Sequence, residues 1–283
     1  MIDFHTHVLP GIDDGSRDLE MSAGMIREEF LQGTQVIVAT PHFYANRMAV
    51  SRFLERRAQA FDEVCSWRAE QKDADDLPQL LTGAEVYYFQ GMGRAEALPD
   101  LCIQKTVRPG NAGTRTEADT RTEADTHTEA GTHTETDAAE AATVNTRTLL
   151  LEMPFEQWTQ DVLRDVKEIL HRQDLTVVLA HIERYIEFQK DRSIWEQVFD
   201  LPVIPQINAG SFLHTGGLFR RDRKRRFCMQ FLEEHPQMIL GSDAHNLTSR
   251  APNLAAGRKE IADALGEGAL QRIDETTREV LGL

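Results

Sequence analysis

The 283-residue sequence is poor in cysteine and contains no long hydrophobic run. Its three cysteines are widely spaced and odd in number, which is not typical of a disulfide-stabilised secreted domain. Because no stretch of about 18 apolar residues is present, we expect no transmembrane helix. The N-terminus lacks a basic region followed by an apolar stretch, so we expect no signal peptide. These absences together predict a globular protein of the reducing cytoplasm.

Positive charge is also scarce. Against 46 Asp and Glu residues there are only 31 Lys and Arg residues, which gives a formal net charge of −15 at pH 7. Such an excess of negative charge argues against non-specific binding to nucleic acid. It does not exclude a phosphorylated substrate, because metal ions and a few arginines can make one cleft positive.

The hydrophobic pattern predicts strands that alternate with helices, which is typical of a parallel sheet built from right-handed crossover units. No Gly-x-Gly-x-x-Gly follows any of these strands, so the main support for a dinucleotide-binding fold is missing. Seven repeats of the pattern favour a barrel-like closure over an open sheet. The predicted strands are 2–7, 36–40, 79–88, 148–154, 176–181, 202–208 and 238–243.

The first predicted strand carries His5 and His7, two residues apart. Side chains alternate between the faces of a strand, so both imidazoles project to the same side and form a preorganised chelate. Neutral imidazole suits divalent metals such as zinc, manganese or iron. Asp13 and Asp14 follow a turn at Pro10, which places carboxylates close behind the two histidines.

Further metal-ligating side chains fall on or just past the carboxyl ends of the other predicted strands. In barrel folds this edge carries the active site, because several strands converge there. The ligand atoms are nitrogen and oxygen without thiolate, and their number exceeds what one ion requires. We therefore predict a cluster of two or three metal ions. The residues at these strand ends are His42, Glu85, Glu152, His181, Asp243 and His245.

Eight motifs follow one another between residues 5 and 246, namely HTH, GIDDG, ATPH, GAE, LLEMP, AHIERY, INAGS and GSDAHN. In this order they resemble the polymerase-and-histidinol-phosphatase (PHP) superfamily. They resemble more closely the bacterial metal-dependent tyrosine phosphatases of capsule and exopolysaccharide operons. This resemblance implies one distorted (β/α)7 TIM-like barrel over residues 1–283. It also implies two or three divalent ions, most often manganese, and dephosphorylation of a bacterial tyrosine autokinase.

The resemblance also assigns the ligands. One ion would be held by His5, His7, Glu85 and Asp243, and Glu85 would bridge to a second ion. Glu152 and His181 would complete the second site, whereas a third ion would take Asp14, His42 and His245, with Asp13 as the alternative to Asp14. A hydroxide that bridges the ions would be the nucleophile, because a bound cation lowers the pKa of water.

Arg184 and Arg250 resemble the phosphate-binding arginines of this family, and with Asp14 they are the predicted catalytic residues. A guanidinium group can hold phosphate oxygens and stabilise charge during transfer. Its pKa above about 12 makes it a poor acid, so we assign neither arginine as the proton donor to the leaving phenolate. Apart from the resemblance, a surface salt bridge explains either arginine equally well.

Residues 110–147 depart from the family pattern and are predicted to form a disordered insert of low complexity. Within them, residues 114–137 repeat with a period of six as TRTEAD, TRTEAD, THTEAG and THTETD. The repeats have almost no large apolar side chains, so they cannot bury a core. We expect that residues 114–137 can be deleted without loss of folding or of activity on a small phenyl phosphate.

Three alternatives remain beside the tyrosine phosphatase. Cys102 and Arg108 fit the Cys-x5-Arg spacing of thiol-based tyrosine phosphatases, but no glycine lies between them and no histidine precedes the cysteine. A small-molecule phosphomonoesterase of the histidinol-phosphatase type would keep the metals and change the substrate. A non-enzymatic PHP-like module would use its metals for stability alone. The sequence leaves open whether the chain forms a homo-oligomer.

Overall fold

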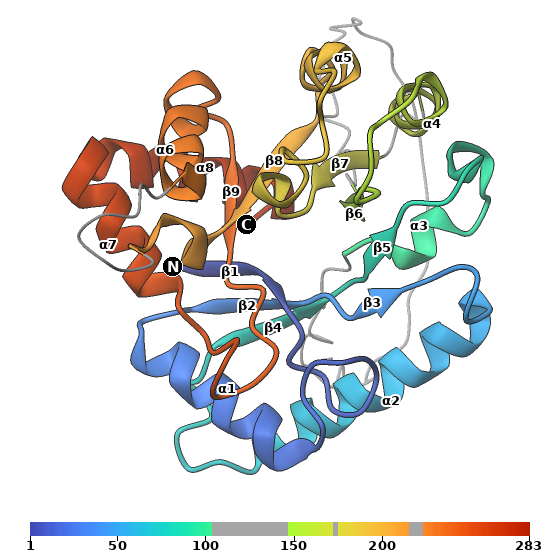
Figure 1. The fold of residues 1–283 in the computed structure, drawn as a ribbon. Helices are drawn as coiled ribbons and strands as arrows, with labels where there is room; N and C mark the ends of the chain where they lie inside the picture. Colours follow the sequence, from blue (N-terminus) through green and yellow to red (C-terminus); the bar gives the residue numbers. More distant parts are fainter. Residues whose placement is uncertain (104–146, 172–174, 215–222) are drawn as a thin grey trace, which may run out of the picture.

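A computed structural model of the protein describes residues 1–103, 147–171, 175–214 and 223–283 (Figure 1). The predicted insert at 110–147 therefore lies outside the described residues, except for Arg147. The strands are β1 (Ile2–Thr6), β2 (Val36–Ala39), β3 (His42–Phe43), β4 (Gln79–Thr82), β5 (Glu85–Tyr87), β6 (Arg147–Glu152), β7 (Leu175–Leu179), β8 (Ile204–Asn208) and β9 (Ile239–Gly241). The α-helices are α1 (Leu19–Leu31), α2 (Val50–Ala69), α3 (Leu98–Leu101), α4 (Gln160–Leu170), α5 (Ser193–Phe199), α6 (Arg223–Glu234), α7 (Leu254–Leu265) and α8 (Glu267–Leu281).

Every pair of neighbouring strands is parallel, which confirms the predicted α/β class. One sheet has the order β1-β2-β4, and the other has the order β3-β5-β6-β7-β8-β9. β1 also meets β9 beyond these ladders, because Thr6 pairs in parallel with Ala244 and the Asp243 amide donates to the His5 carbonyl at 2.8 Å. The strands together form a curled sheet with helices around its outside (Figure 1).

One predicted strand is interrupted in the structure, and another is followed by a short strand that was not predicted. The predicted strand 79–88 is divided into β4 and β5 at Gly83 and Ala84, and a short strand, β3, follows β2 after Thr40 and Pro41. A side chain at Gly83 would meet Ile103 at 2.7 Å, so the chain passes too close there for any larger residue. In both cases the interruption lies just before a predicted ligand, His42 or Glu85.

The helices cover the sheet through their apolar faces. The inner face of α2 is formed by Phe53, Ala60, Phe61 and Val64, which are all buried. Asp18 caps α1, and its side chain accepts a hydrogen bond from the Met21 amide at 2.9 Å.

The buried face of α1 is not formed by its apolar residues alone. Leu19, Ala23 and Phe30 are only half-buried, whereas Glu29 is buried. Glu29 is tolerated in the interior because its carboxylate accepts a hydrogen bond from the Thr34 hydroxyl at 2.6 Å. Hydrophobic spacing alone does not reveal such a partner.

An apolar cluster fills the inside of the curl toward the amino ends of the strands. Phe4 of β1, Val38 of β2, Leu150 of β6 and Val178 of β7 belong to it, and all four are fully buried. This packing fixes the strands against one another and leaves their carboxyl ends to carry polar side chains. Among the described residues, no helix is long and apolar enough to cross a membrane.

Candidate metal centre

The imidazoles of His5 and His7 meet at the carboxyl end of β1, where both side chains are fully buried. Their Nε2 atoms lie 3.1 Å apart, so the two rings converge as the alternation of the strand predicts. The Nδ1 atom of His5 lies 3.0 Å from Gln206 Oε1, and that of His7 lies 2.7 Å from Asp13 Oδ2. Gln206 Oε1 and Asp13 Oδ2 are hydrogen-bond acceptors, so each of the two imidazoles carries its proton on Nδ1. Nε2 of each ring is then free to coordinate a cation.

Asp243 and Glu85 face the same two histidines. Asp243 Oδ1 lies 3.8 Å from His5 Nε2 and 3.4 Å from His7 Nε2. Glu85 Oε2 lies 3.2 and 3.3 Å from these two atoms. Ligand atoms that each lie about 2.1 Å from one ion are separated from one another by about 3–4 Å, so this spacing suits a shared cation.

Glu85 extends the cluster toward Glu152 and His181. Its Oε1 atom lies 2.7 Å from His181 Nε2, which is itself 3.6 Å from Glu152 Oε1. Burial raises the pKa of Glu152 to about 7, and the nearby charge of Glu85 adds to this shift. Burial and the charge of Glu85 both disfavour the ionised form of Glu152. A cation bound between the two carboxylates would stabilise that form, so the pair suits a cation site.

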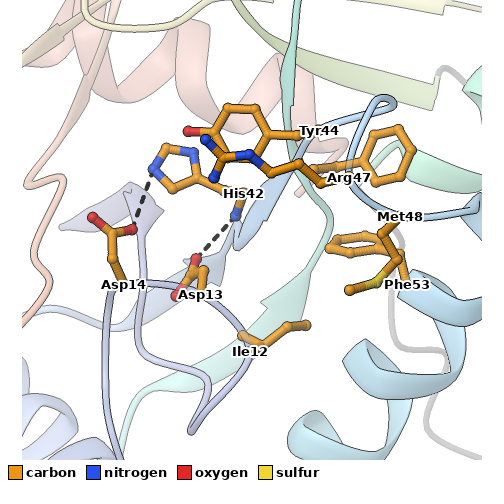
Figure 2. Close-up of a pocket in the computed structure, with 9 residues that line it drawn as sticks. Ile12, Asp13, Asp14, His42, Tyr44, Arg47, Met48 and Phe53 are labelled. Carbon is orange, nitrogen blue, oxygen red and sulfur yellow. Dashed lines mark hydrogen bonds and ion pairs between the residues drawn. The ribbon is translucent and has the colours of Figure 1, made fainter.

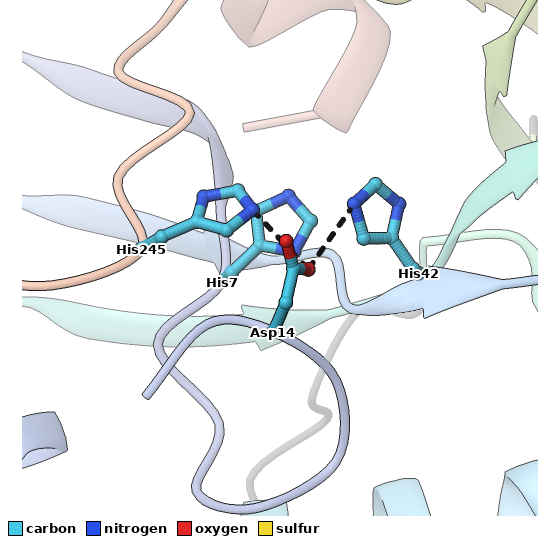
Figure 3. A group of neighbouring side chains, drawn as sticks. All are labelled: His7, Asp14, His42 and His245. Carbon is cyan, nitrogen blue, oxygen red and sulfur yellow. Dashed lines mark ion pairs between the residues drawn. The ribbon is translucent and has the colours of Figure 1, made fainter. Parts of the chain in front are cut away.

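Asp14, His42 and His245 form the third part of the cluster (Figure 3). Asp14 Oδ1 lies 3.5 Å from His42 Nε2 and 3.6 Å from His245 Nε2, and His7 lies beside them. Burial is the main cause that lowers the pKa of His245 to about 3, so the His245 imidazole is neutral. A neutral imidazole is the form that binds metals.

The structure separates the roles of the two adjacent aspartates. Asp13 accepts hydrogen bonds from His7 Nδ1 and from the backbone amides of His42 and Gly15, so both of its oxygens are occupied. Asp14 instead points its carboxylate between two ring nitrogens (Figure 3). A side chain at Gly15 would meet the His7 backbone oxygen at 2.3 Å, so glycine is required for this close turn.

The donor set fits divalent cations. Within the described part of the chain, the buried atoms Glu152 Oε2 and His245 Nε2 have no hydrogen-bond partner, whereas His42 Nδ1 and Glu85 Oε2 face each other at 2.8 Å. Buried polar atoms are normally satisfied, so unpaired ones on facing side chains indicate positions at which a cation would supply the missing partner. Nitrogen and oxygen donors without thiolate suit manganese, iron or zinc. All of the predicted ligands lie in this cluster, and their individual roles remain predictions.

Arg184 and Arg250 border the cluster through Asp243. Arg250 Nη2 donates to both carboxylate oxygens at 2.8 Å, and Arg184 Nη1 lies 3.5 Å from Asp243 Oδ2. The Arg184 guanidinium also lies 5.0 Å from the centre of the Phe155 ring. Both side chains are 37% exposed, so each has a face that can reach a bound anion. The predicted contact with phosphate remains a prediction.

Gln206 is a residue of the centre that the sequence analysis missed. Gln206 Oε1 accepts hydrogen bonds from His5 Nδ1 and from the His181 amide, the latter at 2.8 Å. Gln206 Nε2 donates to Asn208 Oδ1 at 2.9 Å. Asn208 in turn donates to Asp243 Oδ2 at 2.8 Å. One buried chain of hydrogen bonds therefore orients three predicted ligands. The only sequence signal is a polar residue inside an otherwise apolar strand.

Backbone strain marks two of the ligands. Among the described residues, His181 and Asp243 are the non-glycine residues with positive φ, at 30° and 55°. Each follows a strand and turns the chain sharply so that its side chain enters the cluster. Such conformations cost on the order of 1–3 kcal/mol each and concentrate at functional sites.

The thiol alternative receives no support from the structure. Cys102 is 1% exposed, and its Sγ donates to the Leu98 carbonyl within α3 at 3.4 Å. It belongs to none of the metal-ligating groups, and Arg108 lies outside the described residues. His171 is the C-cap residue of α4 and is exposed.

Comparison with known proteins places this centre in a family. The family described as "Capsular polysaccharide synthesis, CpsB/CapC" matches residues 1–102 and 120–280. The tyrosine-protein phosphatase CpsB of Streptococcus agalactiae serotype III (strain NEM316) is 26% identical over 285 residues, covering 99% of this chain and 98% of that protein. The tyrosine-protein phosphatase YwqE of Bacillus subtilis (strain 168) is 25% identical over 258 residues, covering 88% and 79% of the two chains.

The fold also matches a solved structure. A crystal structure from work on YwqE of Bacillus subtilis and CpsB of Streptococcus pneumoniae, described as unique metal-dependent tyrosine phosphatases, has a TM-score of 0.67 at 20% identity. The match covers 99% of this chain and 94% of the other, so the two share one fold throughout. Because the family match spans nearly the whole chain, including every predicted ligand, this protein belongs to the CpsB/CapC family of capsular polysaccharide synthesis.

Proposed function

We propose that this protein is a metal-dependent phosphatase that hydrolyses phosphotyrosine on proteins. The observation that carries the proposal is the convergence of nitrogen and oxygen ligands from separate strand ends on one buried cluster. Relatives that match the chain over most of their length are named tyrosine-protein phosphatases. None of these names supports the alternative of a histidinol-phosphatase type.

We further infer that the curled sheet is a distorted (β/α)7 barrel of the PHP superfamily. β2 with β3, and β4 with β5, each act as one interrupted strand, which gives seven strands around the curl. The pairing of Thr6 with Ala244 supports closure between β1 and β9.

The cluster would hold two or three divalent ions, with manganese as the first choice and iron or zinc as alternatives. One group of ligands is His5, His7 and Asp243, a second is Glu85, Glu152 and His181, and a third is Asp14, His42 and His245. Glu85 lies between the first two groups and would bridge them.

The side chains around the cluster have separate tasks. When bound, divalent cations lower the pKa of water toward neutrality and so supply a nucleophile near pH 7. Arg184 and Arg250 would hold phosphate oxygens and stabilise the charge of the transition state. Asp13 and Gln206 hold the imidazoles of His7 and His5 in the tautomer that coordinates through Nε2.

The proposed protein substrate is a phosphotyrosine-bearing bacterial tyrosine kinase of capsule or exopolysaccharide synthesis, encountered in the cytoplasm. Membership of a family of capsular polysaccharide synthesis supports this assignment. The negative net charge of −15 does not oppose it, because bound divalent ions together with Arg184 and Arg250 would supply positive charge at the site.

Hydrolysis of a phosphotyrosine peptide tests the proposal. The protein is assayed as isolated, after EDTA, and after addition of manganese, together with His5→Ala and Cys102→Ser. We expect loss of activity with EDTA, recovery with manganese, an inactive His5→Ala variant and an active Cys102→Ser variant. Activity that survives EDTA but disappears in Cys102→Ser would refute the metal-dependent mechanism.

A further inference from the structure

The loop between β3 and α2 separates two cavities that both reach the predicted metal ligands. The first cavity, of about 340 Å³, is lined by Asp14 and His42 among others (Figure 2). The second cavity, of about 420 Å³, is lined by Glu152 and by several aromatic side chains. Tyr44 and Arg47 of the loop line both cavities, so they stand between two routes to the metal centre.

The second cavity suits an aromatic ring. Tyr44, Tyr87 and Phe155 are among its walls, and the rings of Tyr44 and Tyr87 lie 5.5 Å apart. Flat side chains of this kind pack well against another ring. Phe155 also lies beneath the guanidinium of Arg184, a predicted phosphate ligand. The second cavity therefore lies next to Arg184, which could bind a phosphate, and its aromatic walls could hold the phenyl ring that carries this phosphate.

Arg47 is an uncommitted positive charge at the rim of this cavity. Its guanidinium lies 4.4 Å from the centre of the Tyr44 ring, and the two side chains lie together in Figure 2. Within the part of the chain that the structure describes, Arg47 forms no ion pair, whereas Arg184 and Arg250 both face Asp243. Arg47 is exposed. Its charge is therefore available to a bound molecule.

We propose that Arg47 is a specificity-determining residue that binds an anionic side chain next to the phosphotyrosine. The phosphotyrosine ring occupies the second cavity, and a neighbouring carboxylate or second phosphate of the same peptide contacts the guanidinium. The proposal rests on the proposed function. Charge complementarity supports the proposal, because an exposed guanidinium without an ion pair among the described residues attracts an anionic side chain of the peptide.

The test compares three phosphotyrosine peptides that differ only in the residues beside the phosphotyrosine: glutamate, a second phosphotyrosine, or glutamine. We expect the wild-type protein, loaded with manganese, to prefer both anionic peptides. In Arg47→Gln, the ratio of kcat/KM for an anionic peptide to that for the glutamine peptide falls about fivefold, mainly through KM. This corresponds to about 1 kcal/mol, the upper range for an exposed charge pair. Arg47→Lys restores part of the preference because it keeps the charge.

A matched control is Arg272→Gln, which removes an exposed arginine from α8, far along the chain and outside the lining of both cavities. We expect this variant to keep the wild-type ratio. The preference should also shrink in 1 M salt, where the screening length is about 3 Å. A preference that persists in 1 M salt would contradict a contact between charges.

The second cavity is tested separately with Tyr87→Ala. Loss of the ring should raise KM severalfold for all three peptides alike, because the contact is with the phosphotyrosine ring and not with its neighbours. An unaltered KM would contradict the assigned cavity.

The outcomes distinguish this inference from the proposed function. If Arg47→Gln slows all three peptides equally, Arg47 is not a specificity determinant and the inference is wrong, whereas the phosphatase assignment stands. If wild-type protein with manganese hydrolyses none of the peptides, the proposed function is wrong and the inference falls with it.

Discussion

The carboxylate of Asp13 and the imidazole of His7 lie 2.7 Å apart, and this contact determines which of two adjacent aspartates faces the metal centre. Because Asp13 is committed to His7 and to backbone amides, Asp14 alone is left to point between His42 and His245. The two residues should therefore respond differently to substitution.

We expect Asp14→Ala to lose one equivalent of bound metal, because it removes a ligand from the exposed third group. Asp13→Asn should keep the full number of ions but bind them about 10–100-fold more weakly, as is usual when a partner of a ligating histidine is changed. Metal content after dialysis and competition with a chelator measure both effects. The same loss of one equivalent in both variants would contradict the separation of roles.

Gln206 should act as a positioning residue for two histidines. Gln206→Leu fills a similar volume but removes the acceptor for His5 Nδ1 and for the His181 amide. We expect metal affinity to fall about 10–100-fold. Metal titration followed by calorimetry is the measurement, and Gln230→Leu, on the exposed part of α6, serves as the matched control. Equal affinities in the two variants would show that Gln206 does not orient the ligands.

Metal removal should lower thermal stability as well as activity. Repulsion between Glu85 and Glu152, which burial makes severe, is relieved when a cation binds. Metal at about 100 times its dissociation constant would add about 2.7 kcal/mol to the free energy of unfolding. Thermal unfolding in EDTA and in manganese measures this gain in stability. The gain should disappear in His5→Ala and persist in His171→Ala, which alters an exposed histidine. A gain of equal size in the wild-type protein and both variants would refute specific binding at the centre.

Removal of residues 114–137 should leave folding and metal-dependent activity intact. The Ile103 amide donates to the Thr148 carbonyl at 2.8 Å, so the chain on either side of the segment is already held together. A shorter connection therefore adds little strain, and closing a shorter loop costs less entropy. Yield, metal content and hydrolysis of a small aryl phosphate are the readouts. Aggregated or metal-free protein would contradict this prediction.

The ion pair between α7 and α8 should contribute to stability without touching the site. Arg258 donates to both oxygens of Asp274 at 2.7 and 2.8 Å, and its side chain is 11% exposed. We expect Asp274→Asn to lower the free energy of unfolding by about 1–2 kcal/mol, because a partly buried guanidinium loses its paired charge. Urea unfolding measures the change, and phosphatase activity at 25 °C should stay the same.

The clustering of the candidate ligands could be predicted from the sequence, because strand ends can be located in it and parallel strands end at one edge; their roles as ligands remain predictions. The shared face of His5 and His7 follows from the alternation of side chains along a strand. The position of Asp243 and His245 follows from the end of a buried apolar run. The choice between Asp13 and Asp14 could not be predicted, because it depends on one hydrogen bond across a turn. Glu29 and Gln206 were missed for the same reason, since their buried partners come from other parts of the chain.

The contact between β1 and β9 has a consequence for how the protein is made. His5 and His7 are synthesised long before Asp243 and His245, which lie in the last quarter of the sequence. Contacts of such large sequence separation form slowly. The first and third groups of predicted ligands therefore remain incomplete on a nascent chain until residues 243–245 have left the ribosome and β9 has joined β1.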